Sequence, residues 1–228
     1  MKRFTVEEVA RTIDHAVLKP FATREDVEKA ARMCMARGVG SLCVRPSDVA
    51  LAARLLEGGP TTVSMVVGFP HGGNLPETKA FETTRGLEEG AVEFDMVMNI
   101  GRFLSGDHEH VKRDIAAVVE AAKPRHAMVK VILETGFLTL DQVAVASRLA
   151  EAAGADFVKT STGFGDGHAT PEVIDVMLRT VGGTMGVKAS GGVRDWQTAA
   201  GFLAQGCTRL GVGSTEAVLD GGKADGNY

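Results

Sequence analysis

Hydrophobic positions follow two alternating patterns along the chain. Short apolar runs of strand length, such as residues 39–44 and 127–133, are separated by longer alanine-rich stretches. In those stretches, for example residues 25–33, apolar residues recur at helical spacing. Strands that alternate with helices in this way are typical of βα units, which build a parallel sheet.

The apolar runs of strand length predict eight strands, at residues 12–17, 39–44, 62–67, 92–98, 127–133, 156–160, 186–189 and 208–212. They are separated by roughly 23 to 35 residues, which is close to the repeat of a (β/α)8 TIM-type barrel. A doubly wound open sheet is the rival architecture, but no Gly-x-Gly-x-x-Gly motif follows the first run. We therefore predict an α/β (β/α)8 barrel.

No linker or break in composition divides the chain, so we expect a single barrel domain over residues 1–218. The glycine-rich segment 219–228 is expected to form a flexible tail. Three helices are predicted to begin at threonine caps: Thr23, Thr139 and Thr170, the last of which precedes Pro171.

Composition narrows the possible functions. Hydrophobic residues make up 44% of the 228, enough for a large core, and the formal net charge is −4. That charge offers no basic field for nucleic acid, and no apolar stretch approaches the ~18 residues that span a bilayer. The early acidic N-terminus argues against a secretory signal, and the three cysteines lack metal spacing. We therefore expect a cytoplasmic protein with neither nucleic-acid nor membrane partners.

Two lysines stand in matching frames one βα unit apart. Lys159 opens the sequence KTSTG and Lys188 opens KASGG, each directly after a short apolar run. Adjacent parallel strands lie ~5 Å apart, so the two ammonium groups could approach each other closely. Like charges at that distance resist double protonation, which favours a neutral, nucleophilic amine of the kind an imine-forming enzyme needs. The alternative is that both are exposed charges at strand ends.

Asp95 lies within an otherwise apolar predicted strand, Glu93-Phe94-Asp95-Met96-Val97. An unpaired carboxylate in a buried strand is unfavourable, and a barrel interior that holds lysines would offer compensating charge. Asp95 could serve as one half of a structural ion pair or as a proton shuttle, and both interpretations remain open.

Glycines and hydroxyl residues follow the last three predicted strands. The loops after the seventh and eighth strands of such barrels commonly bind phosphate through backbone N–H groups, although tight strand–helix joints also favour glycine. We predict a phosphate site that includes Thr162, Gly163, Gly191, Gly192, Gly211, Gly213 and Ser214.

Four further features carry weaker signals. Asp14 could reach the barrel mouth or merely form part of a strand-end polar pair, and Cys43 is either a buried packing residue or a reactive thiol. Residues 107–110 (DHEH) resemble metal ligands, but the polar sequence after them favours a helix start, so we expect no metal. Tyr228 ends the predicted tail and could in principle fold over the mouth.

These motifs together resemble the family of deoxyribose-phosphate aldolases over nearly the whole chain. The matching segments are IDH (13–15), LKP (18–20), CV (43–44), VGFP (67–70), EFDMV (93–97), KVILET (130–135), FVKTSTGF (157–164) and VKASGG (187–192). The resemblance implies a (β/α)8 barrel and class I chemistry without a metal or cofactor. It also implies cleavage of a phosphorylated sugar, 2-deoxy-D-ribose 5-phosphate, to D-glyceraldehyde 3-phosphate and acetaldehyde.

The resemblance assigns roles to particular residues. It implies that Lys159 forms the Schiff base, that Lys188 is its electrostatic partner and proton relay, and that Asp95 is the acidic member of that relay. The glycine and hydroxyl residues named above fall at the family's phosphate loops, and we also expect Asp14 and Cys43 to contact substrate. A homo-oligomer, dimer or tetramer, is expected.

This chain departs from the family at three places. Ala16 replaces a usual threonine, Gly213-Ser214 replaces a pair of hydroxyl residues, and His168 stands where glycine is common. Loss of the threonine hydroxyl could weaken a sugar contact. Rival functions are another imine-forming aldolase or transaldolase, or a phosphosugar-binding regulatory protein without turnover. A metal-dependent aldolase is disfavoured.

Overall fold

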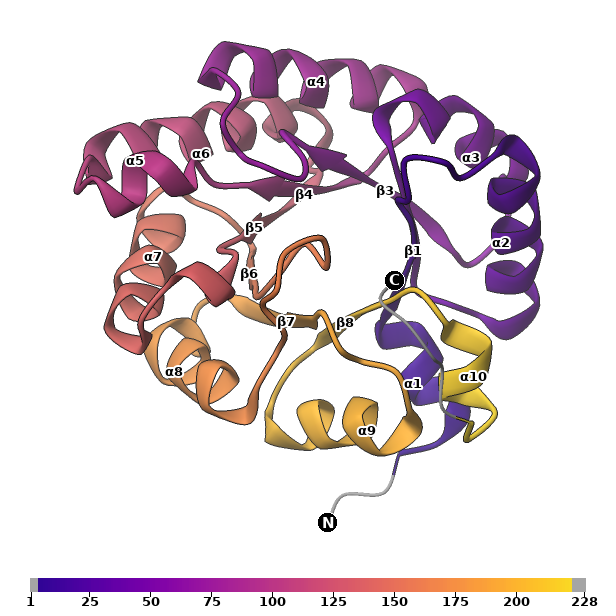
Figure 1. Ribbon diagram of the computed structural model, residues 1–228. Helices are drawn as coiled ribbons and strands as arrows, with labels where there is room; N and C mark the ends of the chain where they lie inside the picture. The colour runs from indigo at the N-terminus through magenta and orange to yellow at the C-terminus, as the bar shows by residue number, and fades with distance from the viewer. Residues whose placement is uncertain (1–3, 223–228) are drawn as a thin grey trace.

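The computed structural model describes residues 4–222, which form a closed barrel of parallel strands with helices outside it (Figure 1). Each strand pairs with the next one in the chain, and β8 closes the barrel against β1. The strands in the described residues are β1 (Ile13–Val17), β2 (Ser41–Val44), β3 (Thr62–Val67), β4 (Glu93–Val97), β5 (Met128–Ile132), β6 (Phe157–Lys159), β7 (Gly186–Ser190) and β8 (Arg209–Val212).

The predicted barrel is therefore confirmed, and the open doubly wound sheet is not formed. Every predicted apolar run contains one strand, and the ends differ by one or two residues at most. The helices of the described residues are α1 (Val6–Thr12), α2 (Arg24–Arg37), α3 (Val49–Leu55), α4 (Pro76–Glu89), α5 (Ile100–Leu104), α6 (His108–Ala122), α7 (Leu140–Ala152), α8 (Pro171–Val181), α9 (Trp196–Gln205) and α10 (Thr215–Leu219), with short 3-10 turns η1 (Pro46–Asp48), η2 (Lys123–Arg125) and η3 (Thr135–Phe137).

Side-chain caps set the starts of several helices, as predicted. Thr23 and Thr139 each form a capping box with the third residue of α2 and α7, so two otherwise orphaned donors are satisfied at each start. Thr170 accepts a hydrogen bond from the Val173 N–H at the start of α8, where Pro171 occupies the first helical position.

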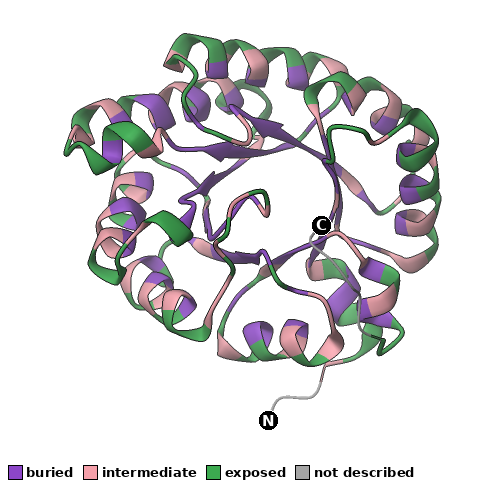
Figure 2. Cartoon of the chain, viewed as in Figure 1, coloured by how far each residue is buried: buried purple, intermediate pink, exposed green. Residues whose placement is uncertain are grey.

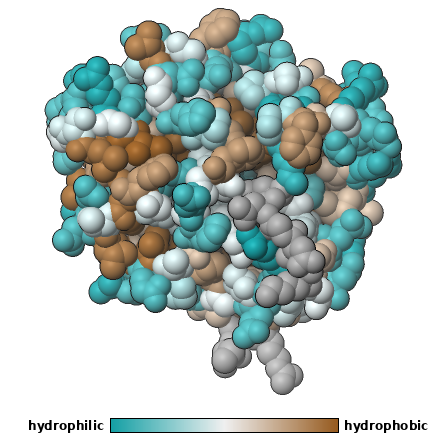
Figure 3. All heavy atoms as spheres, viewed as in Figure 1, coloured by the Kyte–Doolittle hydropathy of each residue, from teal (hydrophilic) through white to brown (hydrophobic). Residues whose placement is uncertain are grey.

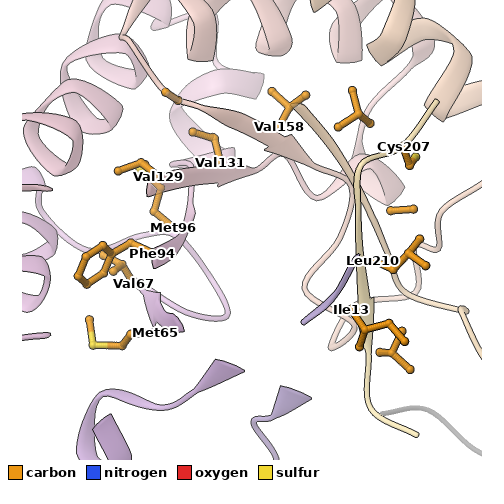
Figure 4. Close-up of a cluster of buried hydrophobic side chains, with 14 of the residues drawn as sticks. Ile13, Met65, Val67, Phe94, Met96, Val129, Val131, Val158, Cys207 and Leu210 are labelled. Carbon is orange, nitrogen blue, oxygen red and sulfur yellow. The ribbon is translucent and has the colours of Figure 1, made fainter. Parts of the chain in front are cut away.

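The strands have two different faces. Residues such as Phe94, Val131, Val158 and Leu210 are buried against the helices in one continuous apolar cluster (Figure 4). Burial colouring shows the strands almost wholly buried and the helices exposed on their outer sides (Figure 2). Because side chains alternate between the two faces of a strand, the residues between these apolar positions point into the barrel, and many of them are charged.

In the segment expected to be a tail, Leu219 ends α10 and is buried, and Asp220 forms an ion pair with Arg37 at 2.7 Å. Residues 223–228, including Tyr228, lie outside the described part of the chain. Within residues 4–222, none of the helices is both long enough and apolar enough to cross a bilayer.

Candidate active site

The alternation of strand faces explains why Asp95 points into the barrel. Its neighbours Phe94 and Met96 belong to the outer apolar cluster, so the residue between them faces the interior. The same logic applies in β5, where Lys130 lies between the outward-facing Val129 and Val131. Asp95 and Lys130 are both fully buried, at 0% exposure.

Asp95 is the hub of the site because it contacts three lysines. Its Oδ2 accepts hydrogen bonds from Lys159 Nζ at 2.8 Å and from Lys188 Nζ at 2.6 Å. Its Oδ1 accepts one from Lys130 Nζ at 2.9 Å. Asp14 lies on the other side of the site and pairs with Lys188. The structure thus brings Asp14, Asp95, Lys159 and Lys188 together, as the sequence predicts.

Lys159 and Lys188 are Cα partners in the pairing of β6 with β7. Both ammonium groups contact one carboxylate oxygen, so the predicted proximity of the two lysines is confirmed. Asp95, for which the sequence leaves an ion pair and a proton shuttle open, lies between the two cations, so a shared anion offsets their mutual repulsion. The proton distribution is therefore a property of the whole buried cluster and not of two lysines.

Three members of the cluster were missed at the sequence level. Lys130 also contacts Glu93 Oε2 at 2.6 Å and Asp14 Oδ2 at 3.4 Å. Arg209 in β8 pairs with Glu93 and lies 3.3 Å from Asp14 Oδ1. A signal existed for two of them: Lys130 is charged within an apolar run, and Glu93 precedes Asp95 by two residues, which puts both on one strand face.

The electrostatics keep the carboxylates ionised. Burial alone would raise the pKa of Asp95, but the ammonium groups of Lys130, Lys159 and Lys188 outweigh it and hold that pKa well below its ordinary value. The pKa of Asp14 is likewise lowered, against burial, by Lys130, Lys188 and Arg209. Burial opposes the charge on Lys130, yet the carboxylates of Asp14, Asp95 and Glu93 raise its pKa overall.

Among the described residues, the charge balance of the cluster favours one neutral amine. The cluster as seen in residues 4–222 has one more basic group than acidic groups: Lys130, Lys159, Lys188 and Arg209 against Asp14, Glu93 and Asp95. A buried net charge is unfavourable, and loss of one lysine proton removes it. If Lys159 gives up its proton, Asp95 still has its contacts with Lys130 and Lys188.

Cys43 is buried beside this cluster, where it packs with Leu18 and Val66. Burial, followed by the nearby Asp95 carboxylate, raises the pKa of its thiol. Cys43 therefore carries a protonated thiol in the wall of the site, which agrees with the packing interpretation. A substrate contact by Cys43 remains a prediction.

The glycine loops at the carboxyl ends of β6 and β7 lie against each other. Gly163, Gly191 and Gly192 all have positive φ angles, between 82° and 85°, which other residues adopt only with strain. The Ala169 N–H donates to the Gly191 carbonyl at 3.1 Å, joining the two loops. His168 lies over this turn: a Cβ added to Gly192 would be 3.4 Å from the His168 Cβ.

Thr162 has a local structural partner. Its hydroxyl and backbone N–H both donate to the buried Glu134 carboxylate, and the N–H reaches Oε2 at 3.2 Å. Glu134 has a left-handed backbone (φ 52°), and these bonds hold it there. Thr162 also lines an apolar cavity of about 470 Å³ with Phe137 and Phe164. Figure 3 shows an apolar area on the side of the molecule where α5 and α7 lie.

The loop after β8 forms a different part of the mouth. Gly211 lies within β8, opposite Asp14 of β1, while Gly213 and Ser214 line a cavity of about 600 Å³ together with Ala16. The buried His15 closes the inner side of this cavity, with Nδ1 2.8 Å from Thr215 Oγ1. Burial lowers the pKa of His15 to about 4, so the imidazole is neutral near neutral pH.

The DHEH segment starts a helix, as the sequence favours. Asp107 caps α6 by accepting the His110 N–H at 3.2 Å, and the His108 ring stacks on Phe103. Within the part of the chain that the structure describes, no three His, Cys, Asp or Glu side chains are grouped so as to hold a metal ion.

A buried lysine pair on a shared carboxylate, at the carboxyl ends of neighbouring strands in a (β/α)8 barrel, is suited to the Schiff-base chemistry of an aldolase, a lyase that cleaves carbon–carbon bonds. The family comparison supports the same class. A model of the DeoC/LacD family of aldolases matches residues 9–206, and the chain belongs to that family.

Individual relatives extend the match over nearly the whole chain. The chain is 49% identical over 220 residues to a deoxyribose-phosphate aldolase of Geobacillus sp. (strain WCH70), covering 96% of this chain and 98% of that one. It is 47% identical over 222 residues to the Clostridium perfringens enzyme of the same name (strain ATCC 13124), covering 97% and 99%. The tetrameric deoxyribose phosphate aldolase structure from Aeropyrum pernix superimposes with a TM-score of 0.89 at 33% identity, covering 95% and 91%.

Proposed function

We propose that the chain is a class I aldolase that reversibly cleaves 2-deoxy-D-ribose 5-phosphate to D-glyceraldehyde 3-phosphate and acetaldehyde, with Lys159 as the Schiff-base lysine. The observation that carries this proposal is the contact of both Lys159 and Lys188 with Asp95 Oδ2 inside a buried barrel. The near full-length relatives named deoxyribose-phosphate aldolase support the choice of substrate.

The chemistry begins with neutral Lys159. Its amine adds to the C1 aldehyde of the open-chain sugar, and loss of water gives a protonated imine. The C3 hydroxyl then loses its proton and the C2–C3 bond breaks, and its electron pair moves toward the imine nitrogen to form an enamine. Glyceraldehyde 3-phosphate leaves at this point. Protonation of the enamine at C2, followed by hydrolysis, releases acetaldehyde and restores the amine.

Asp95 and Lys188 serve the proton transfers. Asp95 is ionised and within hydrogen-bond distance of both lysines, so it can accept a proton from one ammonium and return it. Lys188 is held between Asp14 and Asp95 and contacts the same carboxylate oxygen as Lys159, which keeps it beside the proposed nucleophile. The phosphate is expected at the backbone N–H groups of Gly191–Gly192 and Gly213–Ser214, because these follow β7 and β8.

Borohydride reduction in the presence of 2-deoxyribose 5-phosphate tests the nucleophile. One reduced adduct should form, and peptide mass mapping should place it on Lys159. Lys159→Leu should abolish the label, whereas Lys79→Met, which removes another buried lysine, should retain it. A label on Lys188, or none on the wild-type protein, would overturn the assignment.

Substrate choice and assembly need separate measurements. Initial rates should be higher with 2-deoxyribose 5-phosphate than with ketose phosphates or keto-deoxy sugar acids, which separates this function from other imine-forming aldolases. The tetrameric relative supports a homo-oligomer for this chain. Light scattering during size-exclusion chromatography should therefore give a mass of at least twice the 24.0 kDa of one chain.

A further inference from the structure

Lys130 contacts the Asp95 carboxylate through the oxygen that Lys159 and Lys188 do not use. Its Nζ contacts Asp95 Oδ1 at 2.9 Å, whereas Lys159 and Lys188 contact Oδ2. Lys130 is completely buried and cannot be reached by solvent. The proton steps described above do not use Lys130, so its buried ammonium needs another explanation.

The first effect of Lys130 is geometric. A carboxylate can rotate about its terminal torsion with little resistance, so a single set of contacts on one oxygen does not fix its plane. Lys130 holds Oδ1 and thereby keeps Oδ2 turned toward Lys159 and Lys188. Glu93 holds Lys130 in turn at 2.6 Å, and it is itself fixed by Arg209 and by the Thr62 hydroxyl at 3.0 Å.

The second effect is electrostatic. Three carboxylates surround Lys130 and raise its pKa despite burial, so this side chain stays cationic over the whole range of an activity assay. Among residues 4–222, Lys130 is one of four basic groups in the cluster, against three acidic groups. Without the charge of Lys130, an ammonium at Lys159 would no longer be repelled by the cation on the other side of Asp95. The charged form of Lys159 would then be more favourable.

We propose that Lys130 is a positioning residue of the aldolase: it fixes the plane of Asp95 and supplies the permanent positive charge that makes loss of a proton from Lys159 favourable. The inference deepens the proposed function and rests on it. Glu93, Lys130 and Arg209 form a buried lower layer of the cluster that prepares the nucleophile, while the proton transfers remain with Asp95 and Lys188.

The expected signature is in the pH profile. The acidic limb of kcat/KM reports deprotonation of the essential amine in the free enzyme. Within residues 4–222, the charged and titratable groups around that amine lie on several strands: Asp95 and Glu93 on β4, Lys130 on β5, Lys188 on β7, and Asp14, Cys43 and Arg209 on β1, β2 and β8.

Two single variants change the charge of the lower layer in opposite directions, and a double variant restores it. Lys130→Met removes the fixed cation, so the acidic limb should move up by about one to two pH units and kcat should fall at least tenfold. Glu93→Gln removes an anion and should move the limb down. The double variant Glu93→Gln/Lys130→Met restores the net charge, so its limb should return near the wild-type position while kcat stays low, because Asp95 Oδ1 is no longer held.

Lys79→Met is the matched control. Lys79 is as deeply buried as Lys130 and pairs with Asp114, but this pair lies outside the barrel, between α4 and α6. Its loss should lower stability and leave the limb in place. Should Lys130→Met not fold, Glu93→Gln decides alone, since a downward shift supports the inference and an unchanged or upward limb overturns it.

The two proposals fail differently. If wild-type protein forms the Lys159 adduct but the limb does not follow the charge of the lower layer, the positioning role of Lys130 is wrong and the aldolase function stands. If wild-type protein neither forms the adduct nor cleaves 2-deoxyribose 5-phosphate, the function itself is wrong.

Discussion

Lys79 and Asp114 form a buried ion pair whose removal should be costly for stability. Lys79 Nζ donates to Asp114 Oδ2 at 2.6 Å and to the Val97 carbonyl at 2.9 Å, and both ionic side chains are 0% exposed. The Asn99 N–H donates to the same carboxylate oxygen at 3.2 Å. The pair therefore joins α4 and α6 to the carboxyl end of β4, the strand that carries Asp95.

Each member keeps the other ionised. Burial lowers the pKa of Lys79 and raises the pKa of Asp114, so neither charge would be favourable alone. At 2.6 Å and an effective dielectric of ~20, the attraction is about 6 kcal/mol, which roughly offsets the desolvation of the two groups. The net contribution of the pair is thus small, but breaking it leaves a buried charge.

Lys79→Met should therefore lower the free energy of unfolding by about 3–5 kcal/mol. The double variant Lys79→Met/Asp114→Leu should recover most of that loss and come within about 2 kcal/mol of wild type, since no charge remains buried. Urea denaturation followed by circular dichroism and by the fluorescence of Trp196 measures both. A single variant within about 1 kcal/mol of wild type, or a double variant less stable than Lys79→Met, would refute this reasoning.

Three further outcomes are expected. The pKa of His15 is about 4 in the fold and near 6.5 when unfolded, so wild-type stability is full above pH 6.5 and falls by up to about 3 kcal/mol toward pH 4. His15→Gln should lose this pH dependence in urea titrations. Parallel stability curves for the variant and the wild type would contradict this. His168→Gly should raise KM for 2-deoxyribose 5-phosphate about tenfold by removing a donor beside Gly192, and should leave KM for unphosphorylated 2-deoxyribose unchanged; equal effects on both sugars would rule out a phosphate contact. Asp95→Asn should lower kcat by about 10²–10⁴-fold without loss of the fold by circular dichroism, and a near-normal rate would exclude its proton-transfer role.

The barrel could be predicted because its strands have simple local signatures. Each strand is a short apolar run, and threonine caps mark the starts of helices such as α2 and α7. Lys159 and Lys188 could be predicted as neighbours because parallel strands adjacent in the chain were expected to be adjacent in space, and their register confirms it.

The ion-pair partners within the lower layer of the site could not be predicted from local sequence. Glu93 and Arg209 are 116 residues apart, on β4 and β8, and they meet across the interior of the closed barrel. Local pattern shows which face a strand residue occupies, but the ion pairs depend on side-chain length and on the radius of the closed sheet. The engagement of Thr162 with Glu134 was hidden for a related reason, because it needs the left-handed backbone at Glu134.

The interior charges are divided by sign between the two halves of the chain. Among the cluster members, the acids lie on β1 and β4 and the bases on β5 to β8: Asp14, Glu93 and Asp95 against Lys130, Lys159, Lys188 and Arg209. A fragment that ends after β4 would present an anionic inner wall, and the complementary fragment a cationic one. Electrostatic repulsion therefore opposes self-association of either fragment through its inner wall, and attraction favours joining an N-terminal half to a C-terminal half. The charges that surround the nucleophile thus also favour correct assembly of the barrel.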